Sequence, residues 1–165
     1  LDVAVSNIKR IPPSSIDSTI KNYHWLDLVT GMFDAYDRGH HTAILTDEEN
    51  NVLEGPGFNI FSVDEIGLST PDRGVLEGIT RQTVLDLAKE LNLPFNLKPL
   101  SLQKLKSSTE VFATSTAGGI MPITKINGQQ IGTGIPGKIT RQLHKVYWDK
   151  HTDPTWSLAV EDLLQ

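Results

Sequence analysis

The sequence predicts an α/β or α+β fold built on a mixed sheet. Three short β-rich segments follow one another between residues 43 and 63, and the pair Asn127-Gly128 marks a two-residue hairpin turn. Helical periodicities are interspersed among the β-rich segments without the strict alternation of βαβ units. With 165 residues and no cysteine, the chain is long enough to bury a core without disulfides or a Cys-ligated metal.

The front of the chain combines an extended opening with a helix. The Pro-rich cluster Ile11 to Ser15 interrupts regular structure, so we expect residues 1–15 to be an interdomain connector and residues 16–165 to form one domain. Apolar residues then recur at spacings of three and four, which predicts an amphipathic helix over 26–38 that Gly39 ends. These apolar residues are Trp25, Val29, Met32, Phe33 and Tyr36.

The rest of the chain alternates short strands with three further helices. The expected strands are 43–46, 51–54, 58–63, 95–97, 110–116, 123–126 and 129–131. A helix around 84–91 is indicated by apolar residues at i, i+3, i+4 and i+7, and Asn92 and Pro94 stop it. Ser101 begins a short helix, and the last helix begins after Gly137.

Composition limits the classes of partner and compartment. The net charge of −5 gives no electrostatic reason to expect a nucleic acid or an anionic membrane as partner. No run of about 18 apolar residues predicts a membrane-spanning helix, and no leader pattern is visible. The absence of cysteine suits a reducing compartment, so we expect the cytoplasm. Because the chain starts at Leu1 rather than Met, we expect it to be the back part of a longer protein.

Two motifs with well-known chemistry fail on their context. Gly132 to Lys138 matches both G-x-G-x-x-G and the front of a P-loop, but Ile139 stands where a P-loop needs Ser or Thr. A hairpin precedes this stretch instead of a strand inside a βαβ unit, so we interpret it as a turn leading into a helix. The five histidines form no H-E-x-x-H pair, and we expect no metal site.

Four features remain as candidates for ligand chemistry. Lys21 stands beside an isoleucine and two aromatic residues, where partial desolvation would favour a reactive amine. Glu54 precedes the rigid turn Gly55-Pro56-Gly57, which would fix the direction of its carboxylate. Gly78-Ile79-Thr80 opens a helix, and Thr114 to Gly119 ends a buried strand in small residues, so both are potential phosphate cradles. Taken singly, a surface charge, an ordinary cap or a strand exit explains each feature.

Taken together, the four features match one ligand. A reactive lysine, a carboxylate on a firm turn and two phosphate cradles are what pyridoxal 5′-phosphate requires of a protein. The lysine would bond the aldehyde as a Schiff base, the carboxylate would pair with the protonated ring nitrogen, and the cradles would hold the phosphate.

Four stretches of the sequence also resemble, in order and spacing, the fold-type IV pyridoxal-phosphate enzymes. These stretches are Lys21 to Trp25, Leu53 to Ile60, Thr70 to Arg81 and Thr114 to Pro122. The class includes branched-chain and D-amino acid aminotransferases and aminodeoxychorismate lyase. The closest likeness is to the (R)-selective amine transaminases, through Pro12-Pro13, Met32-Phe33, Pro71 to Gly74 and Ala117 to Pro122. The resemblance extends from Ile8 to about Trp156.

The resemblance implies a fold and a site. Residues 16–165 would form the C-terminal, cofactor-binding large domain of that class, a pseudo-barrel of mixed, largely antiparallel strands flanked by helices. Lys21 matches the Schiff-base lysine, which also carries the proton between substrate carbon and cofactor, and Glu54 matches the carboxylate at the ring nitrogen. The other cofactor-binding matches are Leu76 on the ring face, Ile79 and Thr80 in the phosphate cup, and Thr116 as a second phosphate contact. The substrate-pocket matches are Trp25, Ser115 and Ala117.

The resemblance also implies an activity and partners. It implies a transaminase that moves an amino group from a small-molecule amine or amino acid to a keto acid or ketone, with (R)-amines as substrates, and a homodimer. A D-amino acid or branched-chain aminotransferase, and a lyase that releases pyruvate, are the alternatives within the class. Members carry a smaller N-terminal domain that is absent here, so a separate N-terminal segment or chain is a possible partner. A fragment that is inactive alone and only binds the cofactor or dimerises is the alternative outside the class.

Overall fold

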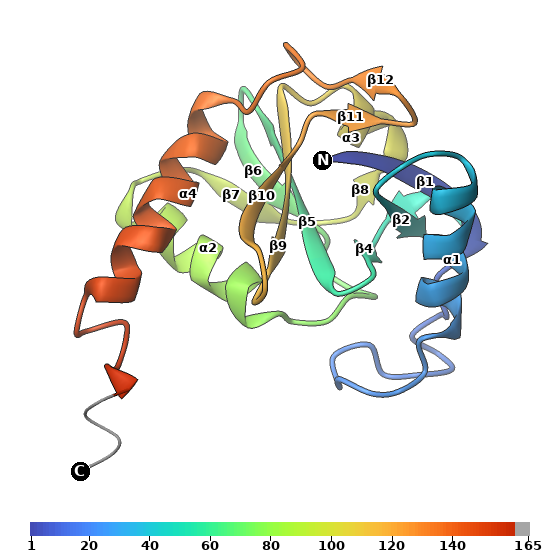
Figure 1. Ribbon diagram of the computed structural model, residues 1–165, viewed down its shortest axis with the longest axis horizontal. Coiled ribbons are helices and arrows are strands. Elements are labelled where there is room, and N and C mark those ends of the chain that lie inside the picture. The colour runs from blue at the N-terminus through green and yellow to red at the C-terminus, as the bar shows by residue number, and fades with distance from the viewer. Residues whose placement is uncertain (161–165) are drawn as a thin grey trace.

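Two six-stranded sheets face each other across a shared core, and helices cover their outer faces (Figure 1). The structure is a computed structural model, and it describes residues 1–160. Helix α1 (Leu26–Asp37) packs on one sheet, and α2 (Ile79–Glu90) and α4 (Lys138–Asp149) pack on the other. The fold is therefore a mixed α/β fold, as the sequence predicts.

The first sheet is completed by the very front of the chain. Its strands are β1 (Asp2–Lys9), β2 (Thr42–Thr46), β3 (Asn51–Val52), β8 (Leu100–Ser101), β11 (Lys125–Ile126) and β12 (Gln129–Gln130), in the order β12-β11-β1-β2-β3-β8. Strand β1 is parallel to both of its neighbours, and Val3 pairs with Thr42 on one side and Ile126 on the other. The expected connector over 1–15 therefore does not describe β1, because its apolar residues complete a sheet and the loop begins only at Arg10.

The second sheet is mainly antiparallel. Its strands are β4 (Glu54–Gly55), β5 (Phe58–Asp64), β6 (Gly67–Thr70), β7 (Phe95–Leu97), β9 (Glu110–Ser115) and β10 (Gly119–Ile123). The order is β10-β9-β5-β6-β7, and β4 pairs with β5. Over both sheets, the pairings β1–β2, β1–β11 and β6–β7 are parallel and the other seven are antiparallel. The prediction of a mixed, largely antiparallel sheet is confirmed.

The expected strand 51–54 is divided between the two sheets. Strand β3 pairs with β2 and β8, whereas β4 pairs with β5, and Leu53 carries the chain from one sheet to the other. Leu53 is buried, and its N–H donates a 3.0 Å hydrogen bond to the Leu45 carbonyl, which fixes the crossing. Glu54 is thus held at the junction of the two sheets.

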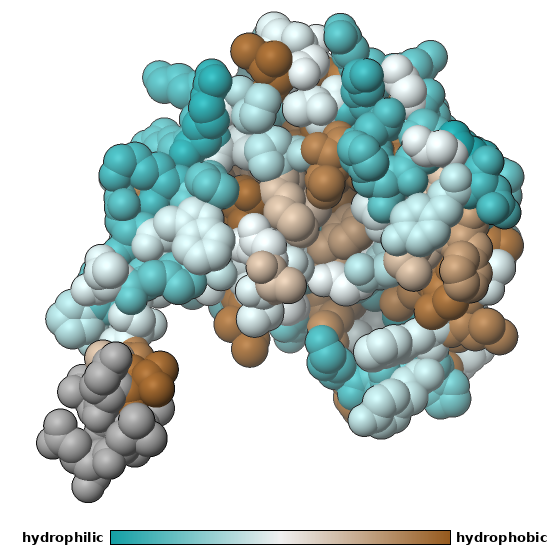
Figure 2. Space-filling model, in the orientation of Figure 1, coloured by the Kyte–Doolittle hydropathy of each residue, from teal (hydrophilic) through white to brown (hydrophobic). Residues whose placement is uncertain are grey.

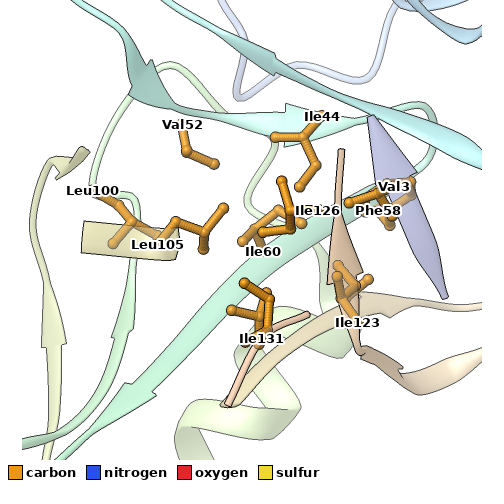
Figure 3. Packing of buried hydrophobic residues seen from close by; sticks show 12 residues of the cluster. Val3, Ile44, Val52, Phe58, Ile60, Leu100, Leu105, Ile123, Ile126 and Ile131 are labelled. Atoms are coloured by element: carbon orange, nitrogen blue, oxygen red, sulfur yellow. The ribbon is translucent and has the colours of Figure 1, made fainter. Parts of the chain in front are cut away.

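Apolar side chains from both sheets fill the space between them (Figure 3). Along β5, Phe58 and Ile60 point into this core, whereas Phe61 belongs to the second core beneath α2 and α4. Phe61 stacks on Phe112 of β9 with ring centroids 5.0 Å apart. Because side chains alternate along a strand, Asn59, which lies between Phe58 and Ile60, faces the helix side of the second sheet.

Several short-range predictions are confirmed. Helices α1, α2 and α4 lie where the periodicities place them, and α3 (Leu102–Lys106) begins after Ser101, whose Oγ accepts a 3.1 Å hydrogen bond from the Lys104 N–H. Asn127 and Gly128 have φ values of 51° and 74°, as a tight hairpin turn requires. A 3₁₀ turn, η1 (Lys150–Thr152), follows α4. Strands β6, β8 and most of β10 are not predicted, because they are short or contain glycine and proline.

Helix α1 packs through its small residues and turns large apolar side chains outward. Its buried residues are Asp27, Gly31 and Ala35, whereas Leu26 and Phe33 are 77% and 58% exposed. A Cβ on Gly31 would lie 2.8 Å from the Leu45 side chain, so small residues are what allow the helix to approach the sheet. Figure 2 shows the resulting apolar surface over α1, in brown on the right of the molecule. The periodicity predicts the helix correctly but not the face that packs.

Candidate active site

Glu54 is a buried carboxylate with two defined donors. It lies at the start of β4 and is 5% exposed. Its Oε2 accepts a 3.0 Å hydrogen bond from the Leu76 N–H, and its Oε1 accepts one of 3.2 Å from Arg10 Nε. Burial raises the pKa of Glu54, and the Leu76 amide and the Arg10 guanidinium oppose that rise. Each carboxylate oxygen has a second lone pair, so Glu54 retains the capacity to accept a further donor.

Arg10 joins Glu54 to a second buried carboxylate. Its Nη1 donates to Asp27 Oδ2 at 2.6 Å, and the side chains of Arg10, Asp27 and Glu54 are 9%, 7% and 7% exposed. The Ile11 N–H also donates to Asp27 Oδ2, at 2.8 Å. Two acids and one base are therefore held together away from water, an arrangement that is stable only while all three remain paired.

The backbone of Leu76 connects Glu54 to the start of α2. Its N–H donates to Glu54, and its carbonyl accepts hydrogen bonds from Asn59 Nδ2 at 2.8 Å and from the Gly78 N–H at 2.9 Å. Asn59 is the cross-strand neighbour of Glu54 in the β4–β5 pair. A Cβ on Gly78 would lie 2.3 Å from Asn59 Oδ1, so the close approach requires glycine there. Glu54 and the start of α2 are thus held at a fixed separation.

The N-terminus of α2 presents donors without partners. Within residues 1–160, the N–H groups of Ile79, Thr80 and Arg81 make no hydrogen bond, and neither does the Thr80 hydroxyl. The first helical bond runs from the Gln82 N–H to the Gly78 carbonyl, at 2.9 Å. Thr80 is buried, and Ile79 directs its side chain outward with 80% exposure. The partial positive charge of a helix start makes such a cluster of donors suitable for an anion.

Helix α4 shows the contrasting case. The carboxylate of Glu110 accepts hydrogen bonds from the Ile139 N–H at 3.1 Å, the Thr140 N–H at 2.7 Å and the Thr140 hydroxyl at 2.7 Å. The stretch Gly132 to Lys138 therefore leads into a helix whose N-terminus is already occupied by the Glu110 carboxylate. This arrangement agrees with its interpretation as a turn before a helix.

The turn between β9 and β10 carries the third group of candidate residues. Thr116 and Ala117 are exposed there, and Ser115 is half-buried, with its Oγ accepting a 3.0 Å hydrogen bond from the Gly118 N–H. Gly119 has φ 62°, and a Cβ on it would lie 2.8 Å from the Tyr147 ring. Helix α4 therefore supports this turn from behind.

A buried hydroxyl without a partner lies one step inside this turn. Thr114 Oγ1 is buried and makes no hydrogen bond within the described residues. Thr114 pairs in register with Asn59, whose amide oxygen lies next to Gly78. The helix-facing side of the second sheet is therefore polar at the point where α2 begins.

Lys21 lies on the loop of residues 10–25, between β1 and α1, and is exposed. The sequence predicts partial desolvation of Lys21 by its neighbours. That prediction is wrong for this chain on its own, because Ile20 and Tyr23 are 61% and 96% exposed and leave the lysine open to solvent. Trp25, at the end of the loop, is 48% exposed.

The candidate residues gather along one edge of the molecule. The 10–25 loop, the β4–β5 turn, the β9–β10 turn and the start of α2 all lie along the lower edge of Figure 1. Direct hydrogen bonds connect Glu54 and Leu76 to the start of α2. Within residues 1–160, no hydrogen bond or ion pair joins Lys21 or Thr116 to Glu54, so these two belong to separate loops at the same edge.

Other kinds of site have little support in residues 1–160. No group of three or more His, Asp or Glu side chains is placed to hold a metal ion. Among the helices of this part of the chain, none has the length and apolar character needed to cross a membrane. A surface hollow of about 460 Å³ lies beside α3, and none of the candidate residues borders it.

Three members of the site are not among the residues predicted from the sequence: Arg10, Asp27 and Asn59. Asn59 does carry a signal, because it is a polar residue inside the apolar run from Phe58 to Val63. Asp27 has the appearance of an ordinary acid in the first turn of a helix, and Arg10 that of a surface charge after a strand. Only the folded chain brings these two charges together with Glu54.

Comparison with known proteins gives consistent matches. The sequence profile of the amino-transferase class IV family matches residues 1–126. A putative branched-chain-amino-acid aminotransferase of Methanocaldococcus jannaschii is 34% identical over 158 residues, which are 94% of this chain and 54% of that protein. The chain spans about half the length of the curated relatives it matches.

Solved structures share the fold. The branched-chain amino acid aminotransferase of T.th. with pyridoxamine 5′-phosphate superposes with a TM-score of 0.90 at 29% identity, over 94% of this chain and 53% of that one. The structure of that aminotransferase complexed with N-(5′-phosphopyridoxyl)-L-glutamate gives a TM-score of 0.88 at 29% identity, over 92% of this chain and 52% of that one. These superpositions confirm the fold that the sequence resemblance implies.

Proposed function

We propose, since this chain belongs to the amino-transferase class IV family, that it is the cofactor-binding part of a pyridoxal-phosphate-dependent aminotransferase. One observation carries this conclusion: the backbone of Leu76 joins the buried carboxylate of Glu54 to the unpaired donors at the start of α2. This cofactor needs an acceptor for the ring nitrogen and a set of donors for the phosphate, and here the two are linked through one residue.

The residues present fit the cofactor by their chemistry. Glu54 has room for one further donor, which suits a protonated ring nitrogen. The N–H groups of Ile79 and Thr80 and the Thr80 hydroxyl would hold the phosphate, with the exposed Thr116 as its second contact. Leu76 is half-buried, so part of its side chain is available to pack on the ring face. When bound, pyridoxal phosphate supplies an electron sink for the carbon that loses its proton.

Each of these residues has a task in the reaction. Lys21 Nζ would hold the cofactor through its aldehyde, and its free amine would move the proton of the substrate carbon. Glu54 keeps a proton on the ring nitrogen, because the Leu76 N–H fixes the direction of its carboxylate and Arg10 stabilises its charge. Exposure of Trp25 and Ala117 leaves them available to a substrate, and Ser115 completes this group.

The substrates that we favour are a branched-chain amino acid and a 2-oxo acid, because the relatives reported above are named for branched-chain amino acids. Transamination of (R)-amines is the second candidate, and it rests on the likeness of Pro12-Pro13, Met32-Phe33 and Pro71 to Gly74. We propose that the protein assembles as a homodimer in the cytoplasm. The residues that the relatives have beyond the matched half would complete each subunit.

Covalent trapping tests the cofactor assignment. The chain is incubated with pyridoxal phosphate, treated with borohydride and digested, and the modified lysine is identified by mass spectrometry. We expect one modified site, Lys21, which is lost in Lys21→Ala and kept in the control Lys125→Ala, an exposed lysine of β11. Modification spread evenly over the surface lysines would contradict the assignment of Lys21.

Activity assays of the protein that contains this chain then separate the substrate classes. The amino donor is either a branched-chain L-amino acid or an (R)-configured arylalkyl amine, and pyruvate or 2-oxoglutarate is the acceptor. Faster turnover of the amino acid supports the first candidate, and faster turnover of the (R)-amine supports the second. Release of pyruvate without an amino acceptor would instead identify a lyase.

A further inference from the structure

Asp27 has no role in the proposed reaction, yet it makes several contacts in the folded chain. It lies in the first turn of α1 and is 8% exposed. Its Oδ2 accepts hydrogen bonds from Arg10 Nη1 at 2.6 Å and the Ile11 N–H at 2.8 Å, and its Oδ1 accepts one from the Leu28 N–H at 2.8 Å. The first two donors begin the 10–25 loop, and the third lies just after its end. One carboxylate therefore closes the base of the loop.

Beyond its base, the loop makes hydrogen bonds only within itself. Every hydrogen bond that residues 12–24 make within the described chain has its partner inside the 10–25 loop. The base, in contrast, is fixed to the first sheet, because the Arg10 N–H donates a 3.0 Å hydrogen bond to the Thr46 carbonyl. Among the hydrogen bonds of the loop, only those at its base therefore set the direction in which it leaves the sheet, and with it the position of Lys21.

The same guanidinium that reaches Asp27 also holds Glu54. Arg10 Nη1 contacts Asp27 at 2.6 Å and Arg10 Nε contacts Glu54 at 3.2 Å. Because the guanidinium is planar and rigid, its two contacts fix the two carboxylates relative to each other. The loop that carries Lys21 is thereby aligned with the carboxylate at the sheet junction.

The geometry points to Asp27 as a positioning residue that acts through Arg10. It fixes the position of the 10–25 loop, which carries Lys21, relative to Glu54. The role of Lys21 in this statement rests on the proposed function, in which Lys21 and Glu54 engage the same cofactor. The effect of Asp27 on the loop itself does not depend on any cofactor. Two measurements therefore separate the two ideas.

The first measurement compares two ligands on the chain. Pyridoxal phosphate has the aldehyde that condenses with the Lys21 amine, releasing water, and borohydride reduces the C=N bond to a stable secondary amine. Pyridoxamine phosphate has no aldehyde, so it reports only the ring and phosphate contacts. For Asp27→Ala we expect the rate of trapping at Lys21 to fall about tenfold, while the Kd of pyridoxamine phosphate changes less than threefold.

Two further variants make this comparison specific. Asp27→Asn keeps an acceptor oxygen for the backbone donors, so we expect it to restore part of the trapping rate. Asp37→Ala removes an exposed acid at the other end of α1, and we expect it to match the wild type. Equal losses for both ligands in Asp27→Ala, or identical behaviour of Asp27→Ala and Asp37→Ala, would overturn the positioning role.

The second measurement needs no cofactor. Under native conditions trypsin cleaves after the exposed Lys21, and the initial rate at that bond reports the mobility of the loop. We expect the rate to rise severalfold in Asp27→Ala and Asp27→Asn relative to Asp37→Ala, with the circular dichroism spectrum unchanged in Asp27→Asn. An unchanged rate in Asp27→Asn would overturn the inference even if the cofactor assignment holds. Failure of the wild-type chain to bind either ligand, with the cleavage rates as expected, would overturn the proposed function alone.

Discussion

The N–H of Leu76 donates a 3.0 Å hydrogen bond to the carboxylate of Glu54, across 22 residues of sequence. Glu54 stands where the chain crosses between the two sheets, and Leu76 stands in the loop that leads into α2. The bond therefore fixes the start of α2 relative to the junction of the two sheets. A change at either residue is expected to affect both proposed anchors of the cofactor.

Replacement of Arg10 by methionine is expected to destabilise the fold severely. Arg10→Met leaves the carboxylates of Glu54 and Asp27 buried without a cation, a change that costs about 3–5 kcal/mol. The control is Lys89→Met, which removes a 61% exposed partner of Asp86 and should change the free energy of unfolding by at most about 1 kcal/mol. Urea denaturation measures both variants. A similar, small loss for the two would show that the buried cluster is unimportant for stability.

The stability of the wild type relative to Glu54→Gln is expected to depend on pH. Burial raises the pKa of Glu54 in the folded protein, so this group contributes stability below its unfolded pKa of about 4.3 and loses that contribution as the pH rises through the folded value. The glutamine variant keeps an acceptor oxygen but does not titrate. The free energy of unfolding of the wild type minus that of the variant should therefore be largest at acid pH and fall toward neutrality. Urea titrations from about pH 4 to pH 8 measure the difference, and an increase with pH would be the contrary result.

Removal of the Thr80 hydroxyl is expected to weaken phosphate binding and leave the fold intact. Thr80→Val keeps the shape of a residue whose hydroxyl has no partner in the described chain. Loss of one hydrogen bond to a charged group costs about 1.5–3 kcal/mol, so the Kd of pyridoxal phosphate should rise roughly 10- to 100-fold. The matched control is Thr83→Val in the same helix, where the hydroxyl bonds the Ile79 carbonyl. Titration by absorbance compares them, and equal Kd values would exclude Thr80 from the phosphate site.

A methyl group on Gly119 is expected to disturb the β9–β10 turn through both strain and contact. Gly119→Ala meets a φ of 62° and the Tyr147 ring at 2.8 Å, whereas the control Gly39→Ala meets a φ of 77° and no atom within 4 Å. The two share the backbone strain of about 1–2 kcal/mol, so the contact should make Gly119→Ala worse by a further 1–3 kcal/mol or so. Chemical denaturation of the two variants gives this difference directly. A control as unstable as the test variant would assign the whole effect to backbone strain.

Features with a local cause were predictable from the sequence. The Asn127-Gly128 turn follows from the ease with which these residues adopt positive φ, and the α3 start follows from the Ser101 hydroxyl. Glu54 is predicted as a site residue because a rigid glycine-proline turn follows it, and the start of α2 is predicted because Gly78 precedes Thr80. In each case the signal lies within a few residues of the feature.

Features that depend on distant partners were not predictable. The ion pairs of Arg10 with Asp27 and Glu54 span 17 and 44 residues, and no local sequence pattern predicts them. The apolar periodicity of α1 predicts burial of its large apolar residues, whereas the sheet packs against the face with Gly31 and Ala35. The predicted desolvation of Lys21 depends on its neighbours in sequence, and these side chains are exposed to solvent.

The place of β1 in the first sheet has a consequence for synthesis on the ribosome. Val3 is made well before one of its two partners, Ile126, because the two residues stand far apart in the sequence. Until then one edge of β1 has no neighbour and is a template for strands of other nascent chains. Translation that halts before β11 should therefore leave a product prone to aggregation, and chaperones that shield strand edges should matter most in that interval.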